Sequence, residues 1–293
     1  MKWVRVMAYE GMPRPALDYA PCRYGESRVL YRGPKQRLYG SFIAVLGGSE
    51  TYGRFLADPY PSLLQDETGV RTINFGCVNA GVDVFLQDEA VLSAARNAQA
   101  VVIQITGAQN LSNRFYAVHP RRNDRFVRAS AMLRAVFPEV DFTEFHFTGH
   151  MLTTLQHTSD ARFALIRDEL QRVWVARMNL LMAQIGRPVI LLWLGERTPD
   201  DLADRVEDGG PMFVTRRMIR MLRGRIAETI EHRLATDSGV GSLHGKVFTD
   251  AEEAAALAMP GPGTHHALAV RLAEILRPSE SQGEGAMSGN HRP

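Results

Sequence analysis

The stretch that decides the fold is SFIAVLGGSETYG, residues 41–53. Its apolar run, Phe42–Leu46, contains no polar residue, which is typical of a strand covered on both faces, as in a parallel sheet. The run ends abruptly at Gly47-Gly48. Two interpretations fit this ending. Either the chain makes a plain turn in which Ser49 or Thr51 caps the next helix, or it displays a serine nucleophile at the carboxyl end of a parallel strand.

Apolar runs and helical patterns alternate along the rest of the chain. Asp160–Ile185 places apolar residues every three or four positions, as one buried helix face requires. Residues 214–234 carry a second such stripe, and His266–Leu276 a shorter one. Alternation of strand and helix predicts an α/β domain whose parallel sheet is wrapped by helices. The further predicted strands are Thr72–Phe75, Ala100–Ile105, Val189–Leu194 and, as a candidate fifth strand, Lys246–Phe248.

Composition sets the broad class of the protein. The chain has 293 residues, of which 45% are hydrophobic and 23% charged, and these are ordinary values for a globular chain. We expect residues 1–40 to form an irregular N-terminal arm, residues 41–278 the α/β domain, and the polar residues 279–293 a disordered tail. Two widely spaced cysteines, Cys22 and Cys77, favour a reduced compartment over a disulfide framework.

Several function classes are disfavoured. A formal net charge of +2 offers no general case for nucleic-acid binding. No stretch approaches the ~18 apolar residues of a membrane span, and the N-terminus lacks the apolar core of a secretory signal. We therefore expect a soluble cytoplasmic protein with no integral membrane span, while a peripheral membrane role and the oligomeric state stay open.

The sequence also lacks the common motifs for binding a metal or a nucleotide cofactor. His146, His150 and His157 have the spacing of one helix face, but no second ligand cluster and no HExxH accompany them. GxGxxG and GxxxxGK[ST] do not occur either, so the sequence predicts neither a metal nor a dinucleotide cofactor.

Three loops follow predicted strands, and each mixes glycine with short polar side chains. They are GGSETYG at residues 47–53, NFGCVNAG at 74–81 and TGAQN at 106–110. A fourth block, PGPGTHH at 260–266, precedes the last predicted helix. Because ligands gather at the carboxyl ends of parallel strands, we expect the three loops to share one edge of the sheet. The acidic residues 196–208, after the fourth predicted strand, are interpreted as a solvated loop or, alternatively, as a lid.

These four blocks resemble the motifs of the SGNH (GDSL-type) hydrolase superfamily. In chain order, Ser49, Gly81, Asn110 and one of His265 and His266 match that family's serine, glycine, asparagine and histidine. The resemblance covers most of the chain, although only the short blocks carry it, and it is closest to a bacterial branch with a long insert after the third block. It implies a three-layer α/β/α sandwich with a parallel, flavodoxin-like sheet. It also implies ester hydrolysis or acyl transfer.

The resemblance assigns a role to each block. Ser49 would attack the ester, and His266 or His265 would take its proton, because a serine hydroxyl is a weak nucleophile without a neighbouring base. Preorganised donors would hold the tetrahedral oxyanion. The second block offers two residues for this role and the third block two more, so the candidates are Ser49, Gly81, Asn79, Asn110 and Gln109.

Two positions depart from the family pattern. Gly48 stands where the family has the aspartate of Gly-Asp-Ser. Three residues before the two histidines stand Pro262 and Gly263, neither of which can orient an imidazole as the family's aspartate does. A backbone carbonyl, or a carboxylate from elsewhere, would have to replace that acid, whose loss in a Ser-His-Asp triad lowers turnover by about 10⁴-fold. The candidate carboxylates are Asp250, Glu252 and Glu253.

An arginine-rich stretch follows the third block, and Asp124 is the acid within it. Guanidinium forks suit carboxylate, phosphate and sulfate groups. Structural ion pairs with Asp124, Glu139 and Asp141 are the other interpretation. The candidate substrate-binding residues are Arg114, Arg121, Arg122 and Arg125.

The leading functional hypothesis is therefore a serine esterase or acyl-transfer enzyme that acts on a small or carbohydrate-linked ester. The alternative is a catalytically impaired relative that binds an anionic glycan or another anionic ligand through the arginine stretch.

Overall fold

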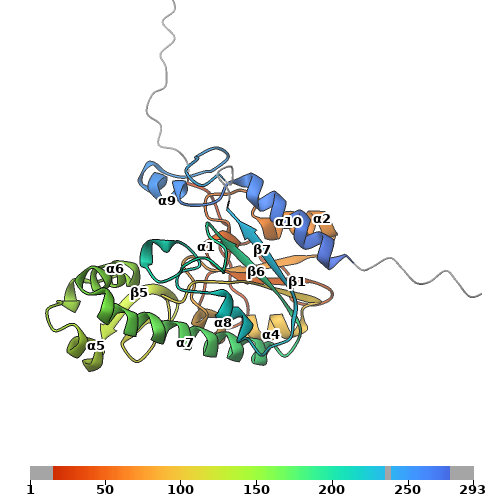
Figure 1. Cartoon of the computed structure of the whole chain (residues 1–293). Coiled ribbons are helices and arrows are strands. Elements are labelled where there is room, and N and C mark those ends of the chain that lie inside the picture. Colours follow the sequence, from red (N-terminus) through yellow and green to blue (C-terminus); the bar gives the residue numbers. More distant parts are fainter. Residues whose placement is uncertain (1–15, 235–238, 278–293) are drawn as a thin grey trace, which may run out of the picture.

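The computed structural model describes residues 16–234 and 239–277 of the chain. Its centre is a five-stranded sheet in the order β2-β1-β3-β6-β7, and every pair of neighbouring strands is parallel (Figure 1). The predicted class, a three-layer α/β/α sandwich with a parallel sheet, is confirmed. The strands are β1 (Ile43–Gly47), β2 (Thr72–Gly76), β3 (Ala100–Gln104), β6 (Val189–Gly195) and β7 (Ile226–Arg233).

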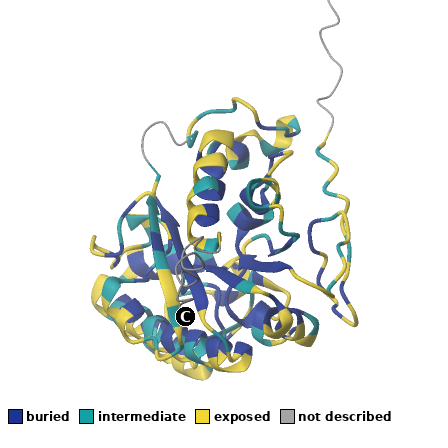
Figure 2. Ribbon diagram, turned by 90° about the vertical axis from the view of Figure 1, so that its right-hand side faces the viewer, coloured by how far each residue is buried: buried dark blue, intermediate teal, exposed yellow. Residues whose placement is uncertain are grey.

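Helices cover both faces of this sheet (Figure 1). The alternating side chains of β1 show the division, since Ile43 and Val45 join the core beneath α2 and α10, whereas Ala44 and Leu46 join the larger core with α4 and α7. Strands β1, β2, β3 and β6 are mostly buried (Figure 2). The described helices are α1 (Ser49–Tyr52), α2 (Tyr60–Thr68), α3 (Asp83–Leu86), α4 (Glu89–Asn97), α5 (Ala131–Val136), α6 (Thr148–Thr158), α7 (Asp160–Ile185), α8 (Arg216–Arg220), α9 (Glu253–Leu257) and α10 (Pro262–Leu276), with 3₁₀ turns η1 (Phe142–Glu144), η2 (Val206–Asp208) and η3 (Asp250–Glu252).

The longest helix, α7, has the bounds that its apolar period predicts. The Ser159 side chain accepts a hydrogen bond from the main-chain N–H of Arg162 and caps the first turn. Gly186 ends the helix in the left-handed conformation, with φ 70°, which glycine adopts without steric cost. Within the described part of the chain, neither α7 nor any other helix combines the length and the hydropathy needed to cross a membrane.

The predicted helix over residues 214–234 is wrong. The segment divides into the short helix α8 and the edge strand β7, separated by Gly224. A Cβ on Gly224 would lie 2.4 Å from Cε and 2.6 Å from Cβ of Met182 in α7, so the chain passes too close to that helix for a side chain. In β7 only Ile230 is buried. Ile226 and Ile230 are four residues apart, and this spacing occurs both on a helix face and in a strand with few buried residues.

The candidate fifth strand at Lys246–Phe248 is also wrong, because these residues have no regular secondary structure. The Lys246 ammonium turns inward and donates to the main-chain oxygens of Gly239 at 2.8 Å and Ala256 at 2.7 Å. Residues 246–248 therefore pack beside α9 instead of joining the sheet.

A two-stranded antiparallel hairpin follows β3, formed by β4 (Tyr116–His119) and β5 (Arg122–Ala129). The buried side chains of Tyr116 and Val118 anchor β4 in the main core. The hairpin and α6 are bridged by Arg125 and Phe147, which pair as an isolated β-bridge. The arginine-rich stretch of the sequence is therefore mostly strand.

The described part of the N-terminal arm, residues 16–40, contains no helix or strand apart from an isolated bridge between Cys22 and Tyr31. Aromatic packing holds it in place, since the rings of Tyr24 and Tyr31 contact Phe75 of β2 with centroids 5.2 Å and 5.4 Å apart. The arm thereby lies beside the carboxyl end of β2. The predicted disordered tail, residues 279–293, lies outside the described residues.

Candidate functional site

Ser49 lies where the sequence predicts, directly after β1 and at the start of α1. Its side chain is almost completely enclosed, at 6% exposure. The Ser49 hydroxyl accepts a hydrogen bond from the main-chain N–H of Asn79 at 3.0 Å and donates to Asn79 Oδ1 at 3.2 Å. Both functions of the hydroxyl are thus used by one neighbouring residue.

The loop that carries Ser49 is tied to β3 by a single glutamine. Gln104 Oε1 accepts hydrogen bonds from the Gly48 N–H at 3.0 Å and the Thr51 hydroxyl at 2.5 Å. Its Nε2 donates to Glu50 at 2.8 Å. The buried amide at the end of β3 therefore sets the direction in which the chain leaves β1.

Asn79 connects the second loop to the other two. Its backbone is in the left-handed region, with φ 55°, which asparagine tolerates better than most residues. Its carbonyl oxygen accepts from Asn110 Nδ2 at 3.0 Å, and its own Nδ2 donates to Asp124 at 3.0 Å. The structure therefore brings Ser49, Asn79 and Asn110 together at one edge of the sheet.

The other two oxyanion candidates have different surroundings. The N–H of Gly81 donates to Asn123 Oδ1 at 3.0 Å, so this donor is already used. A Cβ on Gly81 would lie 2.1 Å from the Asn110 carbonyl oxygen, which explains the glycine. Gln109 Oε1 is buried and has no hydrogen-bond partner within the described residues. No hydrogen bond in this part of the chain joins Gln109 to Ser49.

The histidines do not pair with Ser49 in the described structure. His265 is 1% exposed, and its Nδ1 accepts the main-chain N–H of Tyr60 at 3.0 Å. Tyr60 begins α2, whose N-cap, Pro59, provides no side-chain acceptor. The first N–H groups of a helix lack partners within the helix, so His265 satisfies one of them. His266, one position along α10, is exposed.

The environment of His265 also makes its imidazole a weak proton acceptor. Burial, and then the positive charge of Arg32 and Lys246, lower the pKa of the imidazole to about 3. Among the carboxylates considered as orienters, Glu252 accepts from the hydroxyl of Thr249 at 2.9 Å and caps η3. Within the described residues, no hydrogen bond therefore joins Ser49 to either histidine, and Glu252 is engaged at η3.

A cavity of about 860 Å³ opens beside this network and is lined by arginines. Arg121, Arg122 and Arg125 come from the hairpin, and Arg23 and Arg28 from the N-terminal arm. We call this cavity the arginine pocket. Its further lining residues are Ser27, Leu30, Tyr52, Cys77, Val78 and His119.

The arginine pocket contains three of the four predicted substrate-binding residues. Arg114 lies elsewhere, with its Nε 3.2 Å from Glu169 of α7. Arg23 and Arg28 were not predicted, because the sequence shows no relation between the arm and the hairpin. Within the described residues, no ion pair joins a carboxylate to any of the five pocket arginines. Arg125 instead lies over the ring of Phe147, 4.1 Å from its centroid.

Two further lining residues of the arginine pocket, Cys77 and Tyr52, are uncharged near neutral pH. Burial first, and the negative charge of Asp124 second, raise the pKa of the Cys77 thiol to about 11, so the thiol is protonated near neutral pH. Burial likewise raises the pKa of the Tyr52 phenol to about 12. These two lining residues therefore add no charge to that of the arginines near neutral pH.

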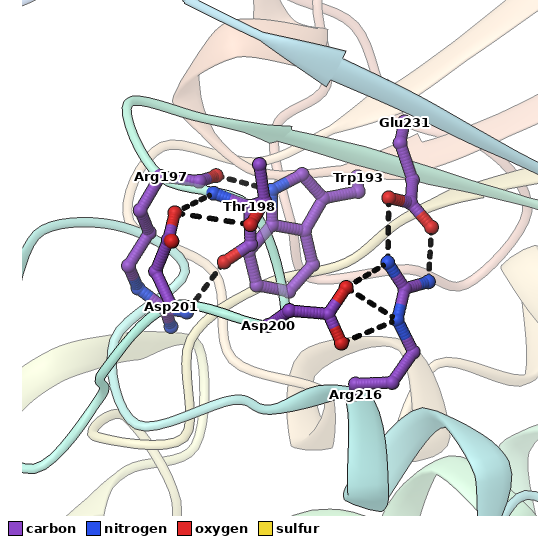
Figure 3. A network of polar contacts seen from close by, with 7 residues as sticks. All are labelled: Trp193, Arg197, Thr198, Asp200, Asp201, Arg216 and Glu231. Carbon is purple, nitrogen blue, oxygen red and sulfur yellow. Dashed lines mark hydrogen bonds and ion pairs between the residues drawn. The ribbon is translucent and has the colours of Figure 1, made fainter.

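The acidic loop after β6, interpreted from sequence as solvated or as a lid, is held by two arginines (Figure 3). The buried Arg197 lies over Trp193 with 5.0 Å to the ring centroid and donates to the Val214 carbonyl at 2.7 Å. Arg216 bridges Asp200 at 2.7 Å and Glu231 of β7 at 2.8 Å. These contacts fix the loop against the end of the sheet.

Comparison with known families adds one result. Residues 7–280 match the family described as "Domain of unknown function (DUF6473)". The chain belongs to this family. No curated protein matches the chain. The DUF6473 description names no activity, so the resemblance to SGNH hydrolases and the residue roles that it implies stay predictions.

Proposed function

We propose that this DUF6473 protein binds a small anionic ligand in the arginine pocket. The observation that carries the proposal is that five arginines line one cavity without a carboxylate partner in the described structure. Like charges that share a cavity repel one another. A bound anion removes that repulsion and satisfies the guanidinium donors, which fit phosphate, sulfate and carboxylate groups in a forked geometry.

The size of the cavity supports a small molecule. Ligand pockets commonly measure about 300–1,000 Å³, and the arginine pocket has about 860 Å³. A phosphorylated or acidic sugar, or a short acidic glycan, fits this range. The half-buried Tyr52 adds an aromatic surface on which a sugar or base ring can pack.

Titration calorimetry with inorganic pyrophosphate tests the proposal. We expect Arg122→Ala to weaken binding by about tenfold or more, because one charge-assisted hydrogen bond contributes about 1.5–3 kcal/mol. Arg114→Ala is the matched control, since Arg114 pairs with Glu169 outside the pocket. Absence of pyrophosphate binding, or equal weakening by both substitutions, would refute an anion site at this position.

The second candidate function is ester hydrolysis or acyl transfer by Ser49. The assembly of Ser49, Asn79 and Asn110 at the carboxyl edge of the sheet favours it. Labelling with a fluorophosphonate probe tests this candidate, with Ser49→Ala as the control. A stoichiometric adduct on Ser49 would support the nucleophile. A folded protein that gives no adduct would leave ligand binding as the function.

A further inference from the structure

The carboxylate of Asp124 lies within the arginine-rich hairpin but pairs with none of its arginines in the described structure. Its Oδ2 accepts a hydrogen bond from Asn79 Nδ2 at 3.0 Å. Asp124 follows Arg122 closely in β5 and immediately precedes Arg125, and both arginines line the arginine pocket. The side chain is half-buried. A negative charge is therefore fixed among the positive charges without being cancelled by a direct ion pair.

Asp124 is not itself one of the residues that line the pocket, but two observations place its carboxylate close to that lining. Its charge contributes to the raised pKa of Cys77, a residue that lines the pocket. Its hydrogen-bond partner, Asn79, follows Val78, which lines the pocket as Cys77 does. Asn79 occupies one oxygen of the carboxylate. No hydrogen bond to Oδ1 is formed by the residues that the structure describes, which leaves this oxygen as an acceptor.

Guanidinium groups alone discriminate poorly between phosphate and sulfate, because both anions are tetrahedral and present similar oxygens. An ionised carboxylate behaves differently, since it only accepts hydrogen bonds. It repels an anion that carries no proton, but it forms a charge-assisted hydrogen bond with an anion that carries one. Phosphate monoesters take up a proton near pH ~6, whereas sulfate and its esters stay unprotonated there.

We propose that Asp124 makes the arginine pocket selective for phosphate and phosphate monoesters over sulfate and sulfate esters. The arginines supply the attraction for the anion, and Asp124 accepts the hydrogen of its P–O–H group. This inference rests on the proposed function, because it requires the arginine pocket to bind anions. Asp124 is a specificity residue in this arrangement, and Asn79 positions it.

Calorimetric titration of the full chain with inorganic phosphate and with inorganic sulfate, both at about pH 6, tests the inference. Both anions are compared at one pH, so the titrations start from the same state of the protein. We expect phosphate to bind about tenfold or more tightly than sulfate, which corresponds to one charge-assisted hydrogen bond. In Asp124→Asn the amide can donate to either anion, so the ratio is expected to fall to about twofold, chiefly through tighter sulfate binding.

The outcomes separate the inference from the proposed function. Pyrophosphate binding together with equal affinities for phosphate and sulfate would overturn the role of Asp124 and leave the anion site standing. A phosphate preference that persists in Asp124→Asn would overturn it as well. Absence of binding by pyrophosphate, phosphate and sulfate would remove both. If Asp124→Asn does not fold, the ratio measured on the wild-type chain decides alone.

Discussion

The main-chain N–H of Asn79 donates a hydrogen bond to Ser49 Oγ at 3.0 Å, and the side-chain Oδ1 of Asn79 accepts one from the Ser49 hydroxyl at 3.2 Å. The hydrogen-bond partner of the serine hydroxyl within the described residues is thus an amide, which cannot act as a base. Asn79 also donates to Asp124, so the same residue links the serine loop to the arginine-rich hairpin.

Ser49→Ala is expected to destabilise the fold by about 1–2 kcal/mol, because it leaves the Asn79 N–H without its acceptor in a partly buried position. Urea unfolding measures this change. Ser93→Ala, at an exposed site in α4, is the control and should change the free energy of unfolding by less than about 0.5 kcal/mol. Equal effects of the two substitutions would mean that the Ser49–Asn79 hydrogen bonds contribute nothing to stability.

The two glycines before Ser49, Gly47 and Gly48, are expected to differ sharply in how far replacement by alanine destabilises the fold. A Cβ on Gly47 would lie 2.0 Å from Thr51 Oγ1 and 2.6 Å from Gln104 Oε1, whereas a Cβ on Gly48 has only the end of the Glu50 side chain within 3.1 Å. We expect Gly47→Ala to cost about 3 kcal/mol or more through overpacking, and Gly48→Ala less than about 1 kcal/mol. Thermal denaturation of the pair checks this, and similar melting temperatures would contradict the packing argument.

Acid should destabilise the protein through His265. Its pKa of about 3 in the fold lies below the value of about 6.5 in the unfolded chain, so the unfolded state binds more protons between these values. Stability is therefore complete above about pH 6.5 and falls as the pH drops toward 3, by about 2 kcal/mol at pH ~5.

His265→Asn is the matched variant, because its side-chain oxygen can still accept the Tyr60 N–H. Urea unfolding at pH ~7.5 and ~5 should show a smaller loss for this variant. The lowered pKa of His232 acts in both proteins and cancels from the comparison. Identical losses would show that His265 does not carry the pH dependence.

Arg197→Met is expected to lower stability by about 3 kcal/mol, because the buried guanidinium donates to several main-chain oxygens of the loop after β6, that of Val214 included. The expected result is a melting temperature lower by several degrees. The exposed Arg220→Met in α8 provides the control, and an equal shift in the two variants would argue against the anchoring role.

The strands of the sheet core could be predicted from sequence because their signal is local. Phe42–Leu46 and Val189–Leu194 are short apolar runs, and a strand buried on both faces needs nothing else. Residues 214–234 were predicted as a helix because the same kind of local signal is ambiguous there. Strand β7 is a half-exposed edge strand, and its few apolar residues also match a helical period.

The candidate site, like the fold, could be predicted from the sequence only in part. Ser49, Asn79 and Asn110 follow three neighbouring parallel strands, so topology alone placed them at one edge. The sequence alone therefore determined strands β1, β2, β3 and β6 and the polar loops at the carboxyl edge of the sheet. Only the tertiary structure decided that His265 accepts the Tyr60 N–H at the start of α2. It also decided that Arg23 and Arg28 of the arm line the same cavity as the arginines of the hairpin. These contacts join residues far apart in the chain, and the packing of the arm and α10 creates them rather than any local pattern of residues.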